Sequence, residues 1–409
     1  MAGPEGLSHP AAANVHPLRN RTFLLVWLGQ TVSLIGSGIS YIAIVWWVFE
    51  ETGSIVIMAT VAIASTIPRL IAGPFAGAYV DRWDRRKVML VLDGAAGVVM
   101  AVIASLLAFN ALQVWHLYAF TGIIGFGAIF HATALLASVP NLVHKEQLSR
   151  ANSLMQVSHG ASTVFGPAIG GVLIAFLGVS LTLWVDAATF LFASAMLLIV
   201  AFPSPRLKTD KTVLADISTG FGFLRRRPSL VTLLGLFAVT NFFIAPLIIL
   251  LPVVASGTLG LGSEGFGFLF SSLGVGLLGG SIIFAAVKLR RHFGLYIIGA
   301  IAGFGAAYVL FGWSTFFFLS IASLGAMGLA VSLASIASST VFQREVPLEL
   351  QGRVFSARAV LAQGLQPASL AVVGVLAERL GAQTVLMGSG ALIVVVALLT
   401  LASASVRKL

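Results

Sequence analysis

The sequence predicts an all-α integral membrane protein with twelve transmembrane helices in two pseudo-symmetric six-helix bundles. Three observations predict this fold: the composition, the lengths of the apolar stretches, and a repeat that relates the two halves of the chain. Of 409 residues, 58% are apolar and 9% are Asp, Glu, Lys or Arg, whereas a soluble domain carries about 25% charged residues. A polar surface this sparse excludes a soluble protein of this size.

Twelve apolar stretches are long enough to cross a bilayer, which takes about 20 mostly apolar residues in a helix. They cover residues 21–49, 54–80, 88–109, 115–140, 151–177, 180–202, 229–255, 264–287, 293–311, 315–340, 354–377 and 383–403. The boundaries near Gly178 and Phe311 are the least marked, because almost nothing polar separates the neighbouring stretches there. We therefore divide the chain into a tail (1–18), a first bundle (19–202), a linker (203–228), a second bundle (229–403) and a tail (404–409).

The basic residues indicate which side of the membrane each loop occupies. Of 24 Lys and Arg residues, all except Arg69 and Arg379 flank the stretches on one side, which leaves 24 − 2 = 22. Loops rich in Lys and Arg stay in the cytoplasm, so both termini are expected there, which requires an even number of helices. The net charge of +10 therefore indicates topology and no nucleic-acid partner. Residues 1–18 have no apolar core, so no cleaved signal peptide is expected.

The linker contains one segment with helical periodicity, from Thr212 to Arg227, in which apolar residues recur at 213, 217, 221 and 224. An Arg triplet closes this segment, which favours an amphipathic helix on the inner leaflet. The alternative is a disordered tether between the two bundles.

The two halves align when the sequence is shifted by 203 residues. The informative matches lie in the loops that follow even-numbered helices, where Glu146 and Arg150 align with Glu349 and Arg353. Parallel six-helix repeats are typical of secondary transporters, whose substrate site lies between the halves near the middle of the membrane.

The loop after the second helix reads GAYVDRWDRRK and contains Gly77, Asp81, Arg82, Arg85 and Arg86. This pattern resembles the signature loop of the major facilitator superfamily. The resemblance implies that the aspartate and arginines close a cytoplasmic gate while the transporter faces outward, and that the glycine permits close helix packing. The alternative is a loop that is basic only to fix the topology.

The fifth helix contains Gly166, Pro167, Gly170 and Gly171 in the sequence GPAIGG. It resembles the glycine-proline element of the antiporter branches of the superfamily, in which proline bends the helix and glycines allow close packing. A bent packing helix in any transporter would carry the same residues.

Longer segments, including TIPRLIAGPFAGAYVDRWDRRKVMLVLD and VFQREVPLELQGRVFS, resemble the macrolide-efflux and enterobactin-exporter branch of the superfamily. That resemblance implies a proton-driven exporter in the bacterial inner (plasma) membrane. The chain departs from the branch at Ser37, where many relatives carry an acid, and at Leu135, where relatives often carry an arginine. Both departures remove ionisable groups from the cavity.

Four ionisable residues inside the predicted helices are candidates for proton coupling, because ionisable groups are costly at membrane depth. They are His131, Arg69, Asp93 and Asp186. Imidazole titrates near physiological pH, which favours His131, unless a hydroxyl of Thr133 or Ser138 satisfies it. Asp93 is also a gate candidate that could pair with the loop arginines or with Arg69, and Asp186 could instead be a hydrogen-bonding group near a helix end.

In the family fold the first, fourth, seventh and tenth helices line the cavity. The candidate substrate-cavity residues are Gln30, Ser33, Ser37, Tyr41, Phe126, Phe130, His131, Asn241, Phe242 and Ser335. Few charges and many aromatic rings suit a lipophilic or amphipathic ligand. No phosphate-binding loop, zinc motif or nucleophile elbow is present, and the chain has no cysteine, so we expect no enzyme, cofactor or metal site.

The leading hypothesis is a proton-coupled exporter of lipophilic compounds that works by rocking of the two halves. Its partners are a small lipophilic substrate, protons and membrane lipids, and the chain is expected to act as a monomer. The alternatives are a siderophore or (lyso)lipid exporter of the same fold, and a gradient-independent facilitator or sensor.

Overall fold

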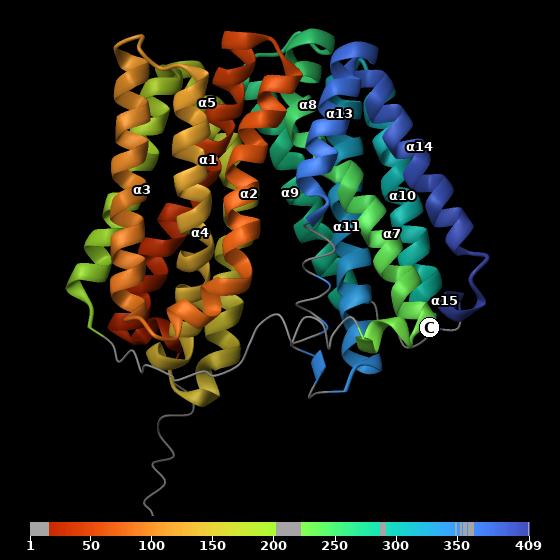
Figure 1. The fold of residues 1–409 in the computed structure, drawn as a ribbon, viewed down its shortest axis with the longest axis horizontal. Coiled ribbons are helices and arrows are strands. Elements are labelled where there is room, and N and C mark those ends of the chain that lie inside the picture. The colour runs from red at the N-terminus through yellow and green to blue at the C-terminus, as the bar shows by residue number, and fades with distance from the viewer. Residues whose placement is uncertain are drawn as a thin grey trace, which may run out of the picture.

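The computed structural model describes residues 16–201, 222–286, 292–347, 350–351, 354, 358, 364–407 and 409. The regular structure in these segments is helical, and the long helices run side by side (Figure 1). Residues 203–221 of the predicted linker (203–228) lie outside the described residues, so the amphipathic helix expected there stays a prediction.

The first half consists of five long helices. These are α1 (Arg21–Thr52), α2 (Ile55–Val80), α3 (Arg85–Ala108), α4 (Val114–Leu142) and α5 (Leu148–Ile199). Polar side chains fix their ends: Asn20 accepts hydrogen bonds from the first turn of α1, and Ser54 and Asp84 do so for α2 and α3. Such caps satisfy backbone N–H groups that have no partner within the helix.

The helix α5 holds two membrane spans that no loop separates. Gly178 lies within it at φ 76° and ψ 168°, a conformation that is strained for residues with a Cβ atom. The chain therefore reverses direction at this glycine, which is where the sequence shows almost no polar boundary between the fifth and sixth predicted helices.

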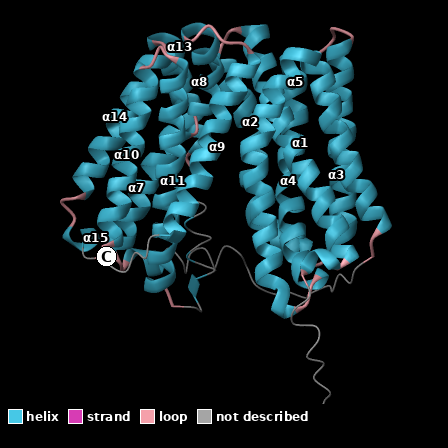
Figure 2. Ribbon diagram, turned by 180° about the vertical axis from the view of Figure 1, so that it is seen from behind, coloured by secondary structure: helices cyan, strands magenta, loops and turns pink. Residues whose placement is uncertain are grey.

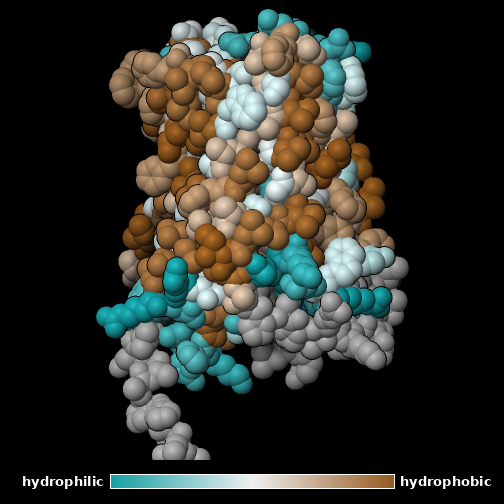
Figure 3. Space-filling model, turned by 90° about the vertical axis from the view of Figure 1, so that its left-hand side faces the viewer, coloured by the Kyte–Doolittle hydropathy of each residue, from teal (hydrophilic) through white to brown (hydrophobic). Residues whose placement is uncertain are grey.

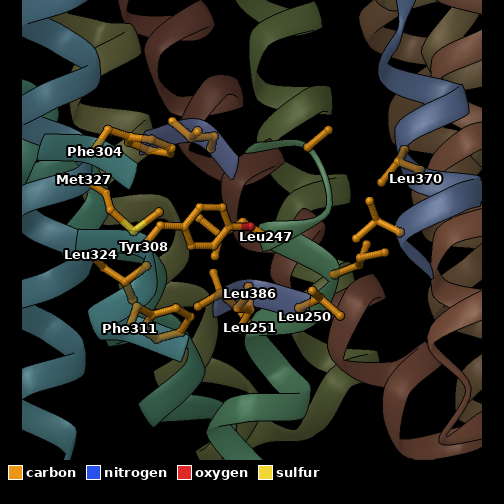
Figure 4. Close-up of a cluster of buried hydrophobic side chains, with 14 of the residues drawn as sticks. Leu247, Leu250, Leu251, Phe304, Tyr308, Phe311, Leu324, Met327, Leu370 and Leu386 are labelled. Carbon is orange, nitrogen blue, oxygen red and sulfur yellow. The ribbon is translucent and has the colours of Figure 1, made fainter. Parts of the chain in front are cut away.

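The second half repeats the plan with shorter elements. They are α7 (Pro228–Ile244), α8 (Leu247–Val253), a π-helical turn (Val254–Thr258), α9 (Ser263–Ala286), α10 (Phe293–Trp313), α11 (Phe317–Glu345), α13 (Gln366–Leu380), α14 (Ala382–Thr400) and α15 (Ala404–Arg407). Its core is centred on Tyr308, whose ring lies between Met327 and Leu247 (Figure 4). The Tyr308 hydroxyl donates a hydrogen bond to the Phe243 carbonyl at 2.9 Å, so this buried polar group is satisfied.

Ten helices of the described chain are long and apolar enough to span a membrane. This set counts α5 once and does not include α13, of which 15 residues are described. Counting α5 as two spans and adding α13 gives 10 + 1 + 1 = 12, so the structure accommodates twelve spans. The membrane-spanning, all-helical fold is confirmed.

The outer surface carries an apolar band (Figure 3). Polar residues lie at both ends of this band. We call one end the basic end, because α1 begins there and Arg85, Lys145 and Arg227 lie at or next to the helix starts beside it. The other end, called the opposite end, contains the turns at Gly53, Gly178 and Gly381. This distribution is what a multi-pass membrane protein requires.

The two halves stand side by side (Figure 2) and meet mainly along two helix pairs, with smaller contacts of α8 against α1 and α2. In the pair α5–α9, the Ser263 hydroxyl donates to the Gly171 carbonyl at 3.2 Å. In the pair α2–α13, the Glu378 carboxylate accepts from the Val56 backbone N–H at 2.8 Å and from the Ser54 hydroxyl at 3.1 Å. Both contacts lie toward the opposite end, so the halves are joined there.

Candidate functional site

A cavity of about 720 Å³ lies mainly inside the first half. Its wall is built by α1, α2, α3 and α4, and the second half adds Ala245, Ile248, Ile249, Gln366 and Leu370. Cavities of roughly 300 to 1,000 Å³ hold drug-sized molecules. Most lining residues are aliphatic, so the wall offers apolar contact with a few polar groups.

Three polar residues on three helices meet in this wall. The Gln30 side-chain amide on α1 donates to Asp93 Oδ2 on α3 at 2.9 Å. His131 Nε2 on α4 lies 3.0 Å from the other carboxylate oxygen, Oδ1. Asp93 is 2% exposed, and a buried carboxylate needs partners of this kind. We call these residues the Gln30–Asp93–His131 cluster.

The cluster lies partway across the protein. Gln30 and Asp93 are nine and eight residues from the start of α1 and α3, and His131 is eleven residues before the end of α4. At 1.5 Å per residue these positions are about 12 to 17 Å from the basic end. Its groups are therefore at membrane depth, within reach of the cavity.

Arg69 also lines the cavity, from α2. Its side chain is exposed to the cavity and makes no hydrogen bond or ion pair with any described residue. The pairing of Arg69 with Asp93 that the sequence suggested is not present among the described residues. Arg69 is therefore a cationic side chain in the cavity wall that has no partner among the described residues.

The residues predicted to line a cavity fall into two groups. Gln30, Ser33, Ser37, Tyr41 and His131 do line the large cavity. Asn241 and Ser335 line a separate void of about 40 Å³ in the second half, and the Asn241 side chain donates to the Phe237 carbonyl within its own helix.

Three aromatic residues predicted for the cavity lie elsewhere. Phe242 packs edge-on against its neighbour Phe243. Phe126 and Phe130 contact each other, and Phe130 also packs against Tyr79 and Trp83. These two residues are four apart on α4, so they share a helix face that points away from the large cavity.

The predicted gate residues make contacts within the first half. Asp81 Oδ1 lies 3.1 Å from Arg85 Nη2, and Arg85 Nη1 donates to the Ala137 carbonyl at 2.8 Å. Arg86 donates to two carbonyls in the last turn of α5, where a cation is favoured by the helix dipole. Arg82 is exposed.

Two expectations for the gate do not hold in this conformation. No described atom would lie within 4 Å of a Cβ added at Gly77, so none of the described helices packs closely on this glycine here. Asp93 does not join the loop arginines either, because its carboxylate is held in the cavity wall by Gln30 and His131.

The GPAIGG segment packs α5 against two different helices. A Cβ at Gly166 would be 2.9 Å from the Gly38 Cα atom, and one at Gly170 would be 3.1 Å from the Ile39 Cα atom, both on α1. Gly171 and the Pro167 carbonyl instead face Gly267 on α9, in the other half. The motif therefore contributes to the contact between the halves, and Gly267 is a partner that the sequence analysis missed.

Asp186 lies outside the cavity wall, between α5 and α1. Its side chain is 0% exposed, and Oδ1 accepts a hydrogen bond from the Thr189 hydroxyl at 3.0 Å. Gly36 on α1 provides the space, because a Cβ there would overlap both side chains.

Several polar lining residues were not predicted. They are Ser40, Ser65, Thr66, Thr121 and Gln366. The first four are small hydroxyl residues, and all four also donate to carbonyls of their own helix, so hydropathy gives no sign of them. Gln366 stands directly before Pro367 in an apolar stretch. A polar residue next to a proline at this place could have identified Gln366 as a lining residue from the sequence.

Comparison with known proteins identifies the family. A family model described as "Transmembrane secretion effector" matches residues 12–408. The chain belongs to this family of the major facilitator superfamily. It is therefore a multi-pass transport protein and not an enzyme.

Several curated relatives of this secretion effector family member are named as efflux proteins or exporters. Macrolide efflux protein A of Streptococcus pyogenes is 28% identical over 395 residues, which cover 95% of this chain and 97% of the relative. Multidrug efflux pump Tap of Mycolicibacterium fortuitum is 26% identical, with 88% and 90% covered. Enterobactin exporter EntS of Shigella boydii is 26% identical, with 81% and 79% covered.

Solved structures confirm the fold of the transporter. The nucleoside transporter NupG matches with a TM-score of 0.76 at 14% identity, covering 93% of this chain and 98% of that one. A bacterial homolog of the human lysosomal transporter Spinster, in an inward-facing and unoccupied conformation, matches with a TM-score of 0.73 at 14% identity, covering 97% and 98%.

Proposed function

We propose that the transporter exports lipophilic or amphipathic small molecules in exchange for protons, by rocker-switch alternating access. The observation that carries this proposal is the Gln30–Asp93–His131 cluster in the wall of a drug-sized cavity. It combines a binding space for an apolar ligand with an imidazole–carboxylate pair that can bind and release a proton.

The cavity supports a lipophilic cargo. Aliphatic side chains make up most of its wall, and the polar groups are hydroxyls, two amides, one histidine, one carboxylate and one guanidinium. Such a wall binds mainly by apolar contact, and the polar groups orient the ligand. The names of the relatives, which include macrolide, multidrug and enterobactin exporters, support the same class of cargo.

The cluster supports proton coupling because it ties three helices together through one carboxylate. When His131 is protonated, the pair with Asp93 is a neutral ion pair; when the proton leaves, Asp93 keeps its charge beside a neutral ring. The contacts among α1, α3 and α4 therefore differ in strength between the two protonation states. Loading from the acidic side and release on the alkaline side would drive the conformational cycle.

The contacts between the halves support an inward-facing assignment. Glu378 bonds to the start of α2 at the opposite end, while Asp81 bonds to Arg85 within its own half at the basic end. If the basic end is cytoplasmic, as the arginines and lysines favour, both termini are in the cytoplasm and the outer gate is closed. The cavity is lined by one chain, so we propose that a monomer suffices.

The test uses inside-out vesicles with an acidic interior and a lipophilic dye. We expect dye accumulation that collapses when a protonophore is added. The variant His131→Ala should reduce gradient-driven accumulation at least tenfold and flatten its pH dependence, because Asp93 loses its titrating partner. His159→Ala is the matched control, since this exposed histidine lies on α5 outside the cavity.

Three other outcomes would each contradict a different part of the proposed function. Accumulation that survives the protonophore would indicate a gradient-independent facilitator. Equal effects of the two histidine variants would refute the coupling role of His131. A dye that is not moved, with a siderophore or lysolipid moved in its place, would correct the cargo and leave the coupling intact.

A further inference from the structure

Asp186 is a buried carboxyl group that is not part of the Gln30–Asp93–His131 cluster. It is 0% exposed, and its Oδ2 atom makes no hydrogen bond of standard geometry within the described residues. The Ser40 hydroxyl on α1 lies against the carboxyl group. Ser40 is itself part of the cavity wall, so a single side chain separates Asp186 from the cavity.

A polar row on α1 connects this group with the cluster. Gln30, Ser33, Ser37 and Ser40 all line the cavity, and their spacing of three, four and three residues places them on one helix face. The row begins at Gln30, which binds Asp93, and ends at Ser40. Ten residues of helix correspond to about 15 Å, so the row spans the distance between the two acids.

The helix packing gives a similar separation. A Cβ at Gly94 would be 3.6 Å from the Ser194 hydroxyl, and one at Gly97 would be 3.3 Å from the Ala187 carbonyl. Asp93 is therefore level with the residues near Ser194, eight positions along α5 from Asp186. This is about 12 Å along the helix, and Asp186 is the acid nearer to the opposite end.

Among the described residues, no cation accompanies Asp186 at its own depth. The helices α1 and α3 pack against this part of α5. Their ionisable side chains within the membrane are Tyr41 and Asp93, and the others lie at the helix ends: Arg21, Glu50, Glu51, Arg85, Arg86 and Lys87. A buried carboxylate without a cation is costly, whereas a protonated carboxyl group is not.

We propose that Asp186 is a second proton-binding site of the transporter, joined to Asp93 and His131 by the polar row on α1. This inference rests on the proposed proton exchange. In the conformation described here the carboxyl group holds a proton and is shielded from the opposite end. Its proton leaves through Ser40 and cavity water, Asp186 becomes a carboxylate, and the Asp93–His131 pair gains the same proton before releasing it at the basic end.

Infrared difference spectroscopy of the full-length protein in lipid nanodiscs tests proton binding directly. An alkaline pH step should remove a protonated-carboxyl C=O band, and Asp186→Asn should abolish that band. Repeating the experiment in Asp93→Asn protein removes any contribution from Asp93. Persistence of the band in Asp186→Asn, or its absence from both the wild type and the Asp93→Asn protein, would overturn the proposal.

Transport in inside-out vesicles separates proton binding from a structural role. Asp186→Asn keeps the size of the side chain but loses the titrating oxygen, so gradient-driven accumulation should fall at least tenfold. Thr182, four residues before Asp186 on α5, is buried and donates to the Gly178 carbonyl. Thr182→Val is the matched control, because it removes a buried hydroxyl from the same helix and leaves the acid and its partners, and it should stay within twofold of wild type. If Thr182→Val impairs transport as much as Asp186→Asn, the role of Asp186 is structural and the proposal fails.

The infrared band and the vesicle transport assay test this inference and the proposed function separately. The infrared band reports proton binding without any transport. A wild-type protein that shows the Asp186 band but no gradient-driven accumulation would refute the antiport proposal while the proton site stands.

Discussion

Replacing Gly171 with alanine should separate the two halves at the opposite end. The added Cβ atom would lie 2.5 Å from the Ser263 carbonyl oxygen and 3.0 Å from the Gly267 Cα atom. Both are backbone atoms of α9, so no side chain can rotate away. Ordinary contact begins at 3.4 Å, so α9 must move by 3.4 − 2.5, or about 0.9 Å.

The energetic cost follows from this displacement. Overpacking of this kind costs about 1 to 3 kcal/mol. The Ser263–Gly171 hydrogen bond, already 3.2 Å long, would be lost, at about 1 kcal/mol. A total of about 2 to 4 kcal/mol changes the ratio of the two conformations by roughly thirty-fold or more. Gly171→Ala should therefore favour the conformation that is open at the opposite end.

Gly160→Ala is a matched control on the same interface. Its Cβ would be 2.9 Å from a terminal methyl group of Leu278, which can rotate without moving the backbone. Both variants gain the same helix propensity, about 1 kcal/mol for Gly→Ala, so that effect cancels in the comparison.

The assay uses spin labels, because the chain has no cysteine to remove. Labels at Ala111→Cys and Thr315→Cys, exposed turn residues in the two halves, report their separation at the opposite end. Gly171→Ala should shift the distance distribution to longer values, whereas Gly160→Ala should match the wild type. Identical distributions for the two variants would refute the packing argument.

Two further predictions concern the two ends of the protein. Glu378→Ala removes the acceptor for the Val56 N–H and the Ser54 hydroxyl, a cap worth about 1 kcal/mol. The same pair of labels should therefore show an additional population at longer label-to-label distances. An unchanged distance distribution would mean that this contact does not hold the opposite end closed. Asp81→Asn should reduce dye accumulation in vesicles while dye affinity stays within a few-fold, because Asp81 lies outside the cavity; unimpaired accumulation would remove its gate role.

The fold could be predicted because a bilayer imposes strong constraints on a sequence. Apolar length and the placement of Arg and Lys indicate the helices and the repeat directly. The boundary between the fifth and sixth helices at Gly178 was the hardest to predict, since a single residue with positive φ replaces a loop and leaves no polar boundary. The amphipathic helix expected in the linker stays a prediction, because residues 202–221 lie outside the described residues.

The site could be predicted in its components but not in its pairings. Gln30, Asp93 and His131 were each singled out, yet their meeting depends on how α1, α3 and α4 rotate about their axes, which hydropathy does not report. Phe130 and His131 were both expected in the cavity, although adjacent helical residues point about 100° apart. Asp93 was also expected beside the gate, and the packing of α3 places it in the cavity instead.

The seventh predicted helix shows a different difficulty. Asn241 was chosen because it is polar, but its amide bonds within its own helix. The wall is built by apolar residues that follow the break at Ala245 and Pro246, such as Ile248. Sequence reasoning that selects polar residues overlooks an apolar wall.

Among the residues that the structure describes, the charged side chains of the cavity are all in the first half of the protein. The described lining residues of the second half are uncharged, so substitutions there would change the shape of the wall and leave its charged groups in place. If protons are exchanged at the Gln30–Asp93–His131 cluster, as proposed, the wall of the second half can vary while the proton-exchanging half stays unchanged. Hybrids that join this first half to the second half of a relative should then change in cargo and keep the same driving force.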